Sequence, residues 1–252
     1  MSFARRVFWA LRQSKYAAET VKVDAPLEAL RYAYWSERRP LRLELPTEML
    51  RMPGAFAYHA GHPFFEALAE GDAALRRFYA GFQPRNLNEM YRLAMPDEKG
   101  ADLAQWEFPW RLYAPRTPPR GEGGLSAKHG VAHYGPCTET KIAQEMRRLT
   151  RTVKSIETKG FHPDRYGDIE GQLLTDGTRV CFLIMGGKHR AAALAHLGAS
   201  HVPVRLRPGR MPLVDTRTPE AWPLVASGDV SARLAVAIAA RYLEGQTAFD
   251  VL

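Results

Sequence analysis

The sequence predicts an α+β fold, in which a mainly helical N-terminal region packs on a smaller α/β core. Between residues 41 and 95, most apolar side chains recur at the spacing of helices. Residues 180–206 instead follow the order strand, glycine turn, helix, glycine stop and strand, and Val202, Val204 and Leu206 alternate as in a strand buried on one face. The second pattern is compatible with a compact parallel crossover unit.

The chain of 252 residues divides into four expected segments. Residues 1–113 form the mainly helical region, 114–134 a loop, 135–208 the α/β core, and 209–252 a helical tail that packs on the core. The loop begins with "APRTPPRGEGGLSAKHG", which has three prolines and four glycines in 17 positions. Long loops of this kind usually serve a site or link domains.

Composition narrows the functional classes. The net charge of +8 fits an acidic partner, such as a nucleotide, a phosphorylated substrate, nucleic acid or an anionic membrane; a solvated arginine-rich surface is the plainer interpretation. No apolar run approaches the ~20 residues that span a bilayer, and no secretory signal is evident at the start. Cys137 and Cys181 lie far apart, which argues against a disulfide framework and favours a cytoplasmic protein.

The first 20 residues form a basic amphipathic segment with Phe3, Val7, Phe8 and Leu11 near one helical face. Such a helix either lies on an anionic membrane, through residues 1–18, or packs on its own domain.

Two histidine pairs do not meet the requirements of a metal site. His59 and His62 have no third ligand at suitable spacing. His129 and His133 are four apart, but a glycine lies between them and the glutamate of a metalloprotease helix is missing. We therefore expect no protein-bound metal from these residues.

Local signals place caps and turns. Asp72 and Ser231 are suited to helix N-caps, Gly245 to a helix end, and Asp176–Gly177 to a hairpin turn before the buried strand "VCFLIM".

A long helix is expected between Thr138, a capping residue, and Gly160. Its apolar stripe contains Ile142, Met146, Leu149, Val153 and Ile156. Basic residues lie off that stripe, either as a solvated face or as part of an anion site: Lys141, Arg147, Arg148, Arg151 and Lys154.

The motif "GGKHR" places cationic side chains at the start of a helix, directly after the buried strand. Gly186 and Gly187 permit close backbone approach, and the first helical amides have no intrahelical partner. An anion can bind the amides of Gly187, Lys188 and His189, with further contacts from the side chains of Lys188 and Arg190. Cations at the positive end of a helix dipole are unfavourable without an anion, so the pattern favours a phosphate or carboxylate site.

"GGKHRAAALAHLGASHVPVRL", preceded by "SIETKGF" and a strand, resembles the ParB N-terminal-like and sulfiredoxin-like superfamily over roughly residues 135–208. Its members have a Gly-x-His-Arg or Gly-x-Arg-Arg signature at a helix start, and they bind nucleotide phosphates there. The resemblance implies phosphate contacts from Gly186, Gly187, Lys188, His189 and Arg190. By analogy with sulfiredoxins it adds Arg148 and Ser155 on the preceding helix, with Arg151 in place of a second hydroxyl.

Departures from the family patterns limit the activity that the resemblance implies. Lys188 occupies the position of the catalytic cysteine of sulfiredoxins, which argues against that activity. A free-serine kinase in the superfamily has an aspartate where this chain has Gly186, and its catalytic glutamate precedes the helix; Glu139 is the nearest counterpart and Glu145 the next. Partition proteins carry a helix-turn-helix domain after the motif, whereas about 45 residues follow here.

Three hypotheses follow from these patterns. The favoured one is a nucleotide-dependent phosphotransferase (kinase) that acts on a small molecule or glycan, using ATP or another nucleotide with Mg²⁺. Lys188, His189 and Arg190 would then neutralise phosphate charge, with His189 and Glu139 as catalytic residues and Glu139 as the base. The second is a nucleotide-responsive DNA-binding or regulatory protein, in which DNA is the less expected partner. The third is a non-catalytic scaffold that binds an anion or a partner.

Overall fold

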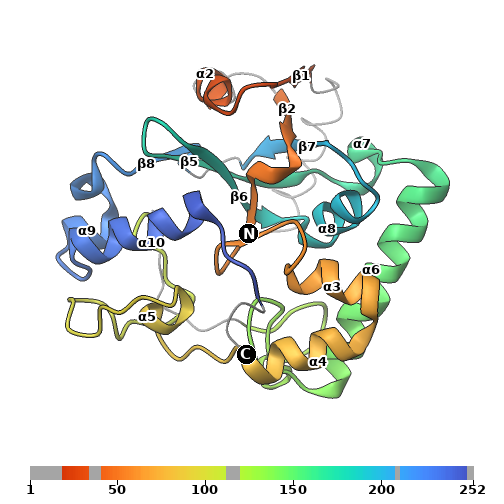
Figure 1. Cartoon of the computed structure of the whole chain (residues 1–252), viewed down its shortest axis with the longest axis horizontal. Helices are drawn as coiled ribbons and strands as arrows, with labels where there is room; N and C mark the ends of the chain where they lie inside the picture. Colours follow the sequence, from red (N-terminus) through yellow and green to blue (C-terminus); the bar gives the residue numbers. More distant parts are fainter. Residues whose placement is uncertain (1–18, 34–40, 112–119, 208–210, 249–252) are drawn as a thin grey trace, which may run out of the picture.

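The structure is a computed structural model that describes residues 19–33, 41–111, 120–207 and 211–248. Within these ranges it confirms a mixed α+β class (Figure 1). Its strands join in a single mixed sheet, ordered β1-β2-β7-β5-β6-β3-β4, with β8 paired to β5. The bounds of the strands are β1 Glu19–Lys22, β2 Leu41–Pro46, β3 Leu50–Met52, β4 Phe56–Ala57, β5 Ile169–Thr175, β6 Val180–Gly186, β7 His201–Leu206 and β8 Leu213–Asp215.

The sheet crosses the boundary expected between the N-terminal region and the core. Strand β2 pairs antiparallel with β7, and β3 pairs parallel with β6. The N-terminal region, expected to be mainly helical, therefore also supplies four strands, β1 to β4, to the sheet. The short strands β3 and β4 lack a periodicity long enough to identify them from sequence.

The β6–α8–β7 segment is not the parallel crossover that its pattern allowed. Helix α8 spans Lys188–His196, close to expectation, but β5 lies between β6 and β7. Because β5 is antiparallel to β6 and parallel to β7, β6 and β7 run in opposite directions. The reason is the hairpin that joins β5 to β6 through the Asp176–Gly177 turn, which was expected and is confirmed.

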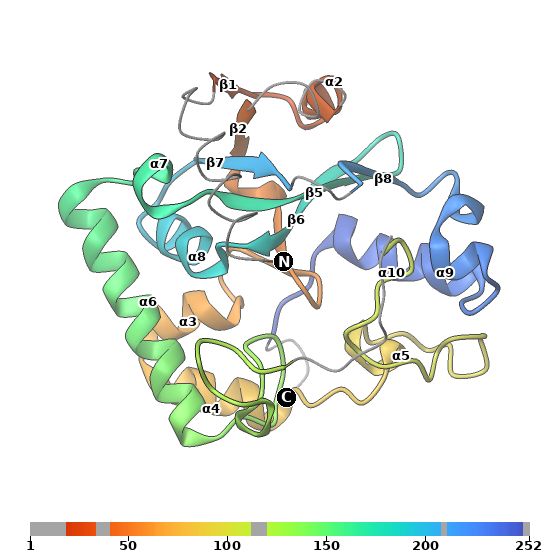
Figure 2. The same cartoon turned by 180° about the vertical axis from the view of Figure 1, so that it is seen from behind.

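Two groups of helices lie on opposite sides of the molecule, α3, α4, α6 and α8 on one and α5, α9 and α10 on the other, whereas α2 and α7 lie higher, near β1 and β7 (Figures 1 and 2). Helix α8 packs against α3 and α6, α4 packs against both α3 and α6, and α10 packs on β5 and β6. The bounds of these and the remaining helices are α2 Ala29–Ala33, α3 Pro63–Glu70, α4 Asp72–Gly81, α5 Leu87–Met90, α6 Glu139–Lys159, α7 Pro163–Tyr166, α9 Pro223–Ala226 and α10 Ala232–Glu244. Short 3₁₀ turns lie at 26–28, 47–49, 127–129 and 219–221.

Helix caps follow the sequence with one exception. The Thr138 side chain accepts from the Lys141 amide, and that of Ser231 accepts from the Leu234 amide. Asp72 is not a cap: Gly71 is the N-cap, and the Asp72 carboxylate lies 3.0 Å from an Arg76 guanidinium one turn later. A charge pair within the first turn has replaced the capping bond.

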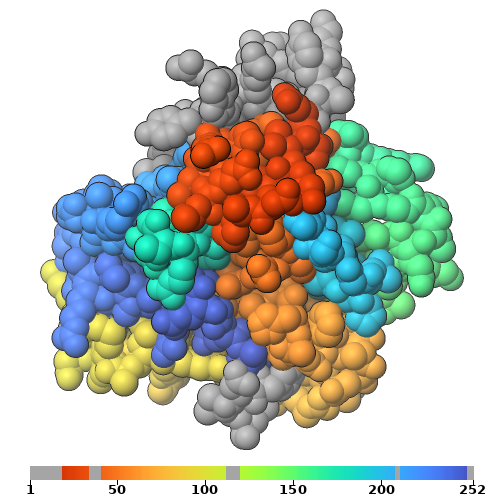
Figure 3. Space-filling model, turned by 45° about the horizontal axis from the view of Figure 1, so that its top comes forward, coloured from red at the N-terminus to blue at the C-terminus, as the bar shows by residue number. Residues whose placement is uncertain are grey.

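The space-filling view shows β1 and α2 on the surface, between the C-terminal elements on one side and α6–α7 on the other (Figure 3). Below them the core is continuous through the sheet and includes Phe182 and Tyr242, both fully buried. In the described part of the chain, no helix has the length and apolar character needed to cross a membrane. The segment 1–18, on which the membrane hypothesis depends, lies outside the described residues.

Candidate functional site

The turn between β6 and α8 requires glycine. Gly187 is the N-cap of α8 and has a left-handed backbone, with φ of 88°. A Cβ atom there would lie 3.0 Å from the Ile169 Cα on the neighbouring strand. No side chain caps the helix at this position, so its first amides are available to a ligand.

A cavity of about 250 Å³ lies against this turn. We call it the polar chamber. It brings together the end of β6, the first turn of α8, one side chain of α6 and two residues from the loop region 120–134. Its lining consists of Glu122, His133, Arg148, Ile184, Met185, Gly186, Gly187, Lys188 and His189.

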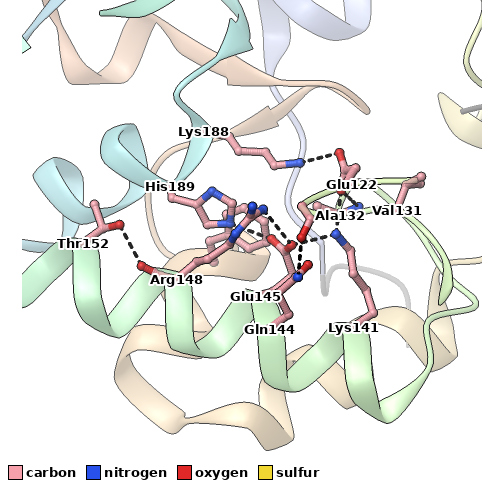
Figure 4. A network of polar contacts seen from close by, with 12 residues as sticks. Glu122, Val131, Ala132, Lys141, Gln144, Glu145, Arg148, Thr152, Lys188 and His189 are labelled. Atoms are coloured by element: carbon pink, nitrogen blue, oxygen red, sulfur yellow. Dashed lines mark hydrogen bonds and ion pairs between the residues drawn. The ribbon is translucent and has the colours of Figure 1, made fainter. Parts of the chain in front are cut away.

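A series of ion pairs links the side chains that line the chamber to the buried side chains of Lys141 and Glu145 on α6 (Figure 4). The Nε2 atom of His189 lies 2.6 Å from one oxygen of Glu145, and the Nζ atom of Lys141 lies 2.7 Å from the other. Lys141 also donates to Glu122 at 2.8 Å, and the second oxygen of Glu122 accepts from Lys188 at 2.8 Å. The side chains of Lys141 and Glu145 are both fully buried, so each relies on the other for its charge balance.

The surroundings set the protonation of these groups. Burial alone would raise the pKa of Glu145, but the hydrogen bond from His189 and the positive charges nearby outweigh it and lower the pKa to about 2. Glu122 is half-buried, and Lys188 and its other partners likewise hold its pKa well below the usual range. Burial lowers the pKa of His189 despite its bond to Glu145, and it lowers the pKa of Lys188. At pH 7 the carboxylates of Glu122 and Glu145 are therefore ionised and His189 is neutral.

This protonation state fixes the tautomer of His189. An ionised carboxylate only accepts hydrogen bonds, so Nε2 of His189 carries the proton that faces Glu145. Its Nδ1 atom is then the basic nitrogen. The ring is held from the other side by Phe64, whose plane lies within 11° of it at 5.1 Å between centroids.

The chamber has an excess of positive charge. The cationic side chains of Lys141, Lys188 and Arg148 pair with the carboxylates of Glu122 and Glu145. Three positive charges against two negative charges give the group a net charge of +1. Arg148 is the least engaged of them: its nearest carboxylate oxygen, on Glu145, lies 3.7 Å away, and its side chain is 37% exposed. Its guanidinium is thus free to take a fork-like contact with an anion.

Most of the expected anion-binding residues meet at this chamber. Gly186, Gly187, Lys188, His189 and Arg148 all line it. The sequence allowed the basic residues of α6 to be either part of an anion site or a solvated face. Arg148 lines the chamber, whereas Arg147, Arg151 and Lys154 are exposed. Lys141, which the pattern placed on the same basic face, is buried.

Arg190, expected as a phosphate contact, is not among the residues that line the chamber. Its guanidinium donates to the carbonyl of Tyr166, and at 2.8 Å to the carbonyl of Asp168. The side chain therefore joins the start of α8 to the segment between α7 and β5. Arg190 lies three residues after Gly187 on α8, and its side chain projects toward the segment between α7 and β5 rather than toward the cavity.

Two further expected residues lie elsewhere. Glu139 is exposed and makes a forked pair with Arg76, at 2.8 Å for the closest atoms. It precedes Glu145 by six residues, or about 9 Å along the helix, so Glu145 and not Glu139 is the carboxylate at the motif. Ser155 lies about 10 Å beyond Arg148 on α6 and is not among the residues that line the chamber.

Sequence patterns missed Glu122 and His133. Glu122 is flanked by Gly121 and Gly123, which both have positive φ values, and these glycines let the loop turn its carboxylate inward. A single acidic residue in a glycine-rich loop was the only available signal. The sequence presents His133 only as half of a histidine pair without a third metal ligand. Burial lowers the pKa of His133 to about 3, so the side chain is neutral.

The described residues hold no group of three or more His, Cys, Asp or Glu side chains placed to bind a metal ion. The histidines considered for a metal have other contacts. His62 accepts a hydrogen bond from the Phe64 amide and caps α3, and its ring stacks on Tyr58. His129 lies 2.9 Å from the Thr138 hydroxyl.

Comparison with known proteins adds nothing to this geometry: no family model matches the sequence, and neither the curated proteins nor the solved structures give a match. The chemistry of the chamber is therefore the basis for a functional proposal.

Proposed function

We propose that the chain is a nucleotide-binding protein of ParB/sulfiredoxin-like type that transfers a phosphoryl group from ATP or another nucleotide to a hydroxyl of a small molecule or glycan. The observation that carries the proposal is the polar chamber. It combines the uncapped amides of α8, an excess positive charge and a neutral histidine oriented by a buried carboxylate.

Phosphate binding follows from the lining of the chamber. The amides at the start of α8 and the positive end of its dipole favour an anion. Arg148 supplies a forked donor, and Lys188 supplies a point charge whose present partner is Glu122. Charge spread over the phosphate oxygens in the transition state is stabilised by the same groups, which is the main requirement of phosphoryl transfer.

His189 is the proposed base. A neutral imidazole with one N–H held by an ionised carboxylate accepts a proton at its other nitrogen. The hydroxyl oxygen of the acceptor would bond to the terminal phosphorus, the bond from that phosphorus to the bridging oxygen would break, and the nucleoside diphosphate would leave. The hydroxyl proton would go to His189. The sequence pattern gave the role of base to Glu139; in this proposal His189 takes that role and Glu145 orients it.

Mg²⁺ is part of the proposal as a companion of the nucleotide. Both carboxylates at the chamber already pair with lysines, and the described residues provide no three-ligand group. Mg²⁺ commonly keeps several waters and binds through substrate phosphates. We therefore propose that it is carried by the phosphates and neutralises their charge.

Two alternative functions have specific support. Arg147, Arg151 and Lys154 border an open groove along α6, which suits the acidic backbone of DNA and the regulatory alternative. The pairing of Lys141 and Lys188 with carboxylates suits a scaffold without turnover. Peripheral membrane binding through residues 1–18 and a cytoplasmic location also remain proposals.

A two-stage experiment separates these functions. Thermal unfolding is first followed with ATP, ADP, CTP and GTP in the presence of Mg²⁺, since a ligand at a hundred times its Kd stabilises the folded state by about 2.7 kcal/mol. The chain is then incubated with γ-labelled ATP and a set of hydroxyl compounds. Stabilisation by ATP with label transfer supports the transferase. Stabilisation that requires DNA and gives no transfer would replace it with the regulatory function.

A further inference from the structure

A second cavity, of about 230 Å³, adjoins the polar chamber. We call it the apolar chamber. The two cavities share Glu122, His133 and Met185 as lining residues, so they meet at one junction. The other lining residues of the apolar chamber include Met90, Trp106, Phe108, Val131 and Leu183.

The apolar chamber is suited to a ring. Its lining is mainly apolar, as small-molecule sites are. Its volume exceeds the roughly 150 Å³ of an engineered apolar cavity that binds benzene. Met90 and Met185 contribute flexible thioether side chains, which make favourable contacts with aromatic groups. The cavity therefore has the size and character to enclose an aromatic group.

Two residues that line this cavity each carry a buried polar atom without a partner within the described ranges: Nε1 of Trp106 and Nδ1 of His133. The indole N–H is a donor only, so it calls for an acceptor on the ligand. His133 stands at the junction, with its Nε2 atom 3.9 Å from Glu122, which is too far for a hydrogen bond. A buried polar atom without a partner costs about 1–3 kcal/mol, so a ligand that satisfies these atoms gains affinity.

We propose that the apolar chamber binds the acceptor of the phosphoryl group, and that this acceptor is an aromatic alcohol rather than a glycan. The proposal rests on the function proposed above. The ring would lie between Met90 and Met185, an acceptor atom on it would take the Trp106 N–H, and its hydroxyl would reach the junction at His133. There the hydroxyl oxygen faces the polar chamber, where the nucleotide phosphates and His189 complete the reaction.

The test uses benzyl alcohol as the ring probe and glycerol as a ringless alcohol, observed by ligand-detected NMR on the full chain. Because the simple probe fills only part of the cavity, binding in the millimolar range is expected. Val131→Phe narrows the cavity, and Trp106→Phe keeps a ring but removes the N–H. Val131→Phe should weaken benzyl alcohol binding at least fivefold. Trp106→Phe should weaken by the same factor the binding of 4-methoxybenzyl alcohol, whose ether oxygen can accept the indole N–H. Arg148→Gln, in the other chamber, should leave the binding of both probes unchanged. Circular dichroism checks that each variant is folded.

The outcomes separate this proposal from the one on which it rests. Adenosine that displaces benzyl alcohol would overturn the acceptor assignment, because the cavity would then hold the nucleobase, while phosphoryl transfer would stand. Benzyl alcohol binding that Val131→Phe does not change, or 4-methoxybenzyl alcohol binding that Trp106→Phe does not change, would also overturn it. A chain that binds benzyl alcohol in this cavity but no nucleotide would overturn the transferase and with it the role of acceptor.

Discussion

Glu145 Oε2 lies 2.6 Å from His189 Nε2 and joins the middle of α6 to the first turn of α8. The other oxygen of the same carboxylate accepts from Lys141, which is fully buried. One buried side chain thus orients the proposed base and balances an interior cation.

Replacement of Glu145 should affect stability and activity together. In Glu145→Gln, Lys141 loses one of its two carboxylates and His189 loses its ionised acceptor. Removal of one partner of a buried pair costs about 3–5 kcal/mol, so the unfolding free energy in urea should fall by about that amount. Glu139→Gln removes the same charge from an exposed, solvent-screened pair and should cost far less. Equal losses in the two variants would contradict the assignment of Glu145.

Arg190 is expected to stabilise the fold without binding phosphate. Arg190→Lys keeps the charge but cannot reach both carbonyls of Tyr166 and Asp168. We expect a lower Tm and an unchanged Kd for ATP, measured at a temperature where the variant is folded. A tenfold weaker Kd with an unchanged Tm would restore Arg190 as a ligand contact.

Gly187 and Gly198 allow the effect of close packing to be separated from that of backbone conformation. Both have positive φ, of 88° and 80°. A Cβ on Gly187 would lie 3.0 Å from Ile169 and Arg190, whereas one on Gly198 would meet nothing within 4 Å. Gly198→Ala should cost about 1 kcal/mol of strain, and Gly187→Ala clearly more. Similar costs in chemical denaturation would show that the turn tolerates a side chain.

Stability should fall as the pH is lowered from 7 to 4. His62 and His133 are neutral in the folded chain because burial lowers the pKa of each to about 3. In the unfolded chain they gain protons below about 6.5, so the unfolded state binds more protons throughout this range and is favoured. Glu145, with its pKa lowered to about 2, adds a loss in the same direction below about 4.5. Urea unfolding at pH 7, 5.5 and 4 checks the trend, and a flat or rising stability would contradict it.

Secondary-structure elements and helix caps could be predicted where they depend on residues close together in the sequence. The β5–β6 hairpin, the α8 helix and the caps at Thr138 and Ser231 each depend on neighbouring side chains and were expected correctly. Strand pairing was not, because β2 and β7 are joined by contacts between residues more than 150 positions apart. The antiparallel relation of β6 and β7 combines the local β5–β6 hairpin with the parallel pairing of β5 and β7, which joins residues from separate parts of the chain, such as Ile169 and Val204.

The site was predictable in part for the same reason. Gly187, Lys188 and His189 are adjacent in sequence, so their common place at the helix start could be inferred. The choice between Glu139 and Glu145 depended on which face of α6 meets α8, and the inward turn of Glu122 depended on the path of a loop. Both are properties of packing that no local pattern records.

The central claim, that the polar chamber binds nucleotide phosphates, is tested most directly by calorimetric titration of ATP with Mg²⁺ into three forms of the chain. Arg148 lines the chamber, and its neighbour Arg147 is exposed on the outer face of α6. The parent should bind ATP, Arg148→Gln about ten- to a hundredfold more weakly, since a charged hydrogen bond contributes about 1.5–3 kcal/mol, and Arg147→Gln as the parent does. A parent that binds neither ATP nor another nucleotide, or two arginine variants that lose the same affinity, would contradict the account.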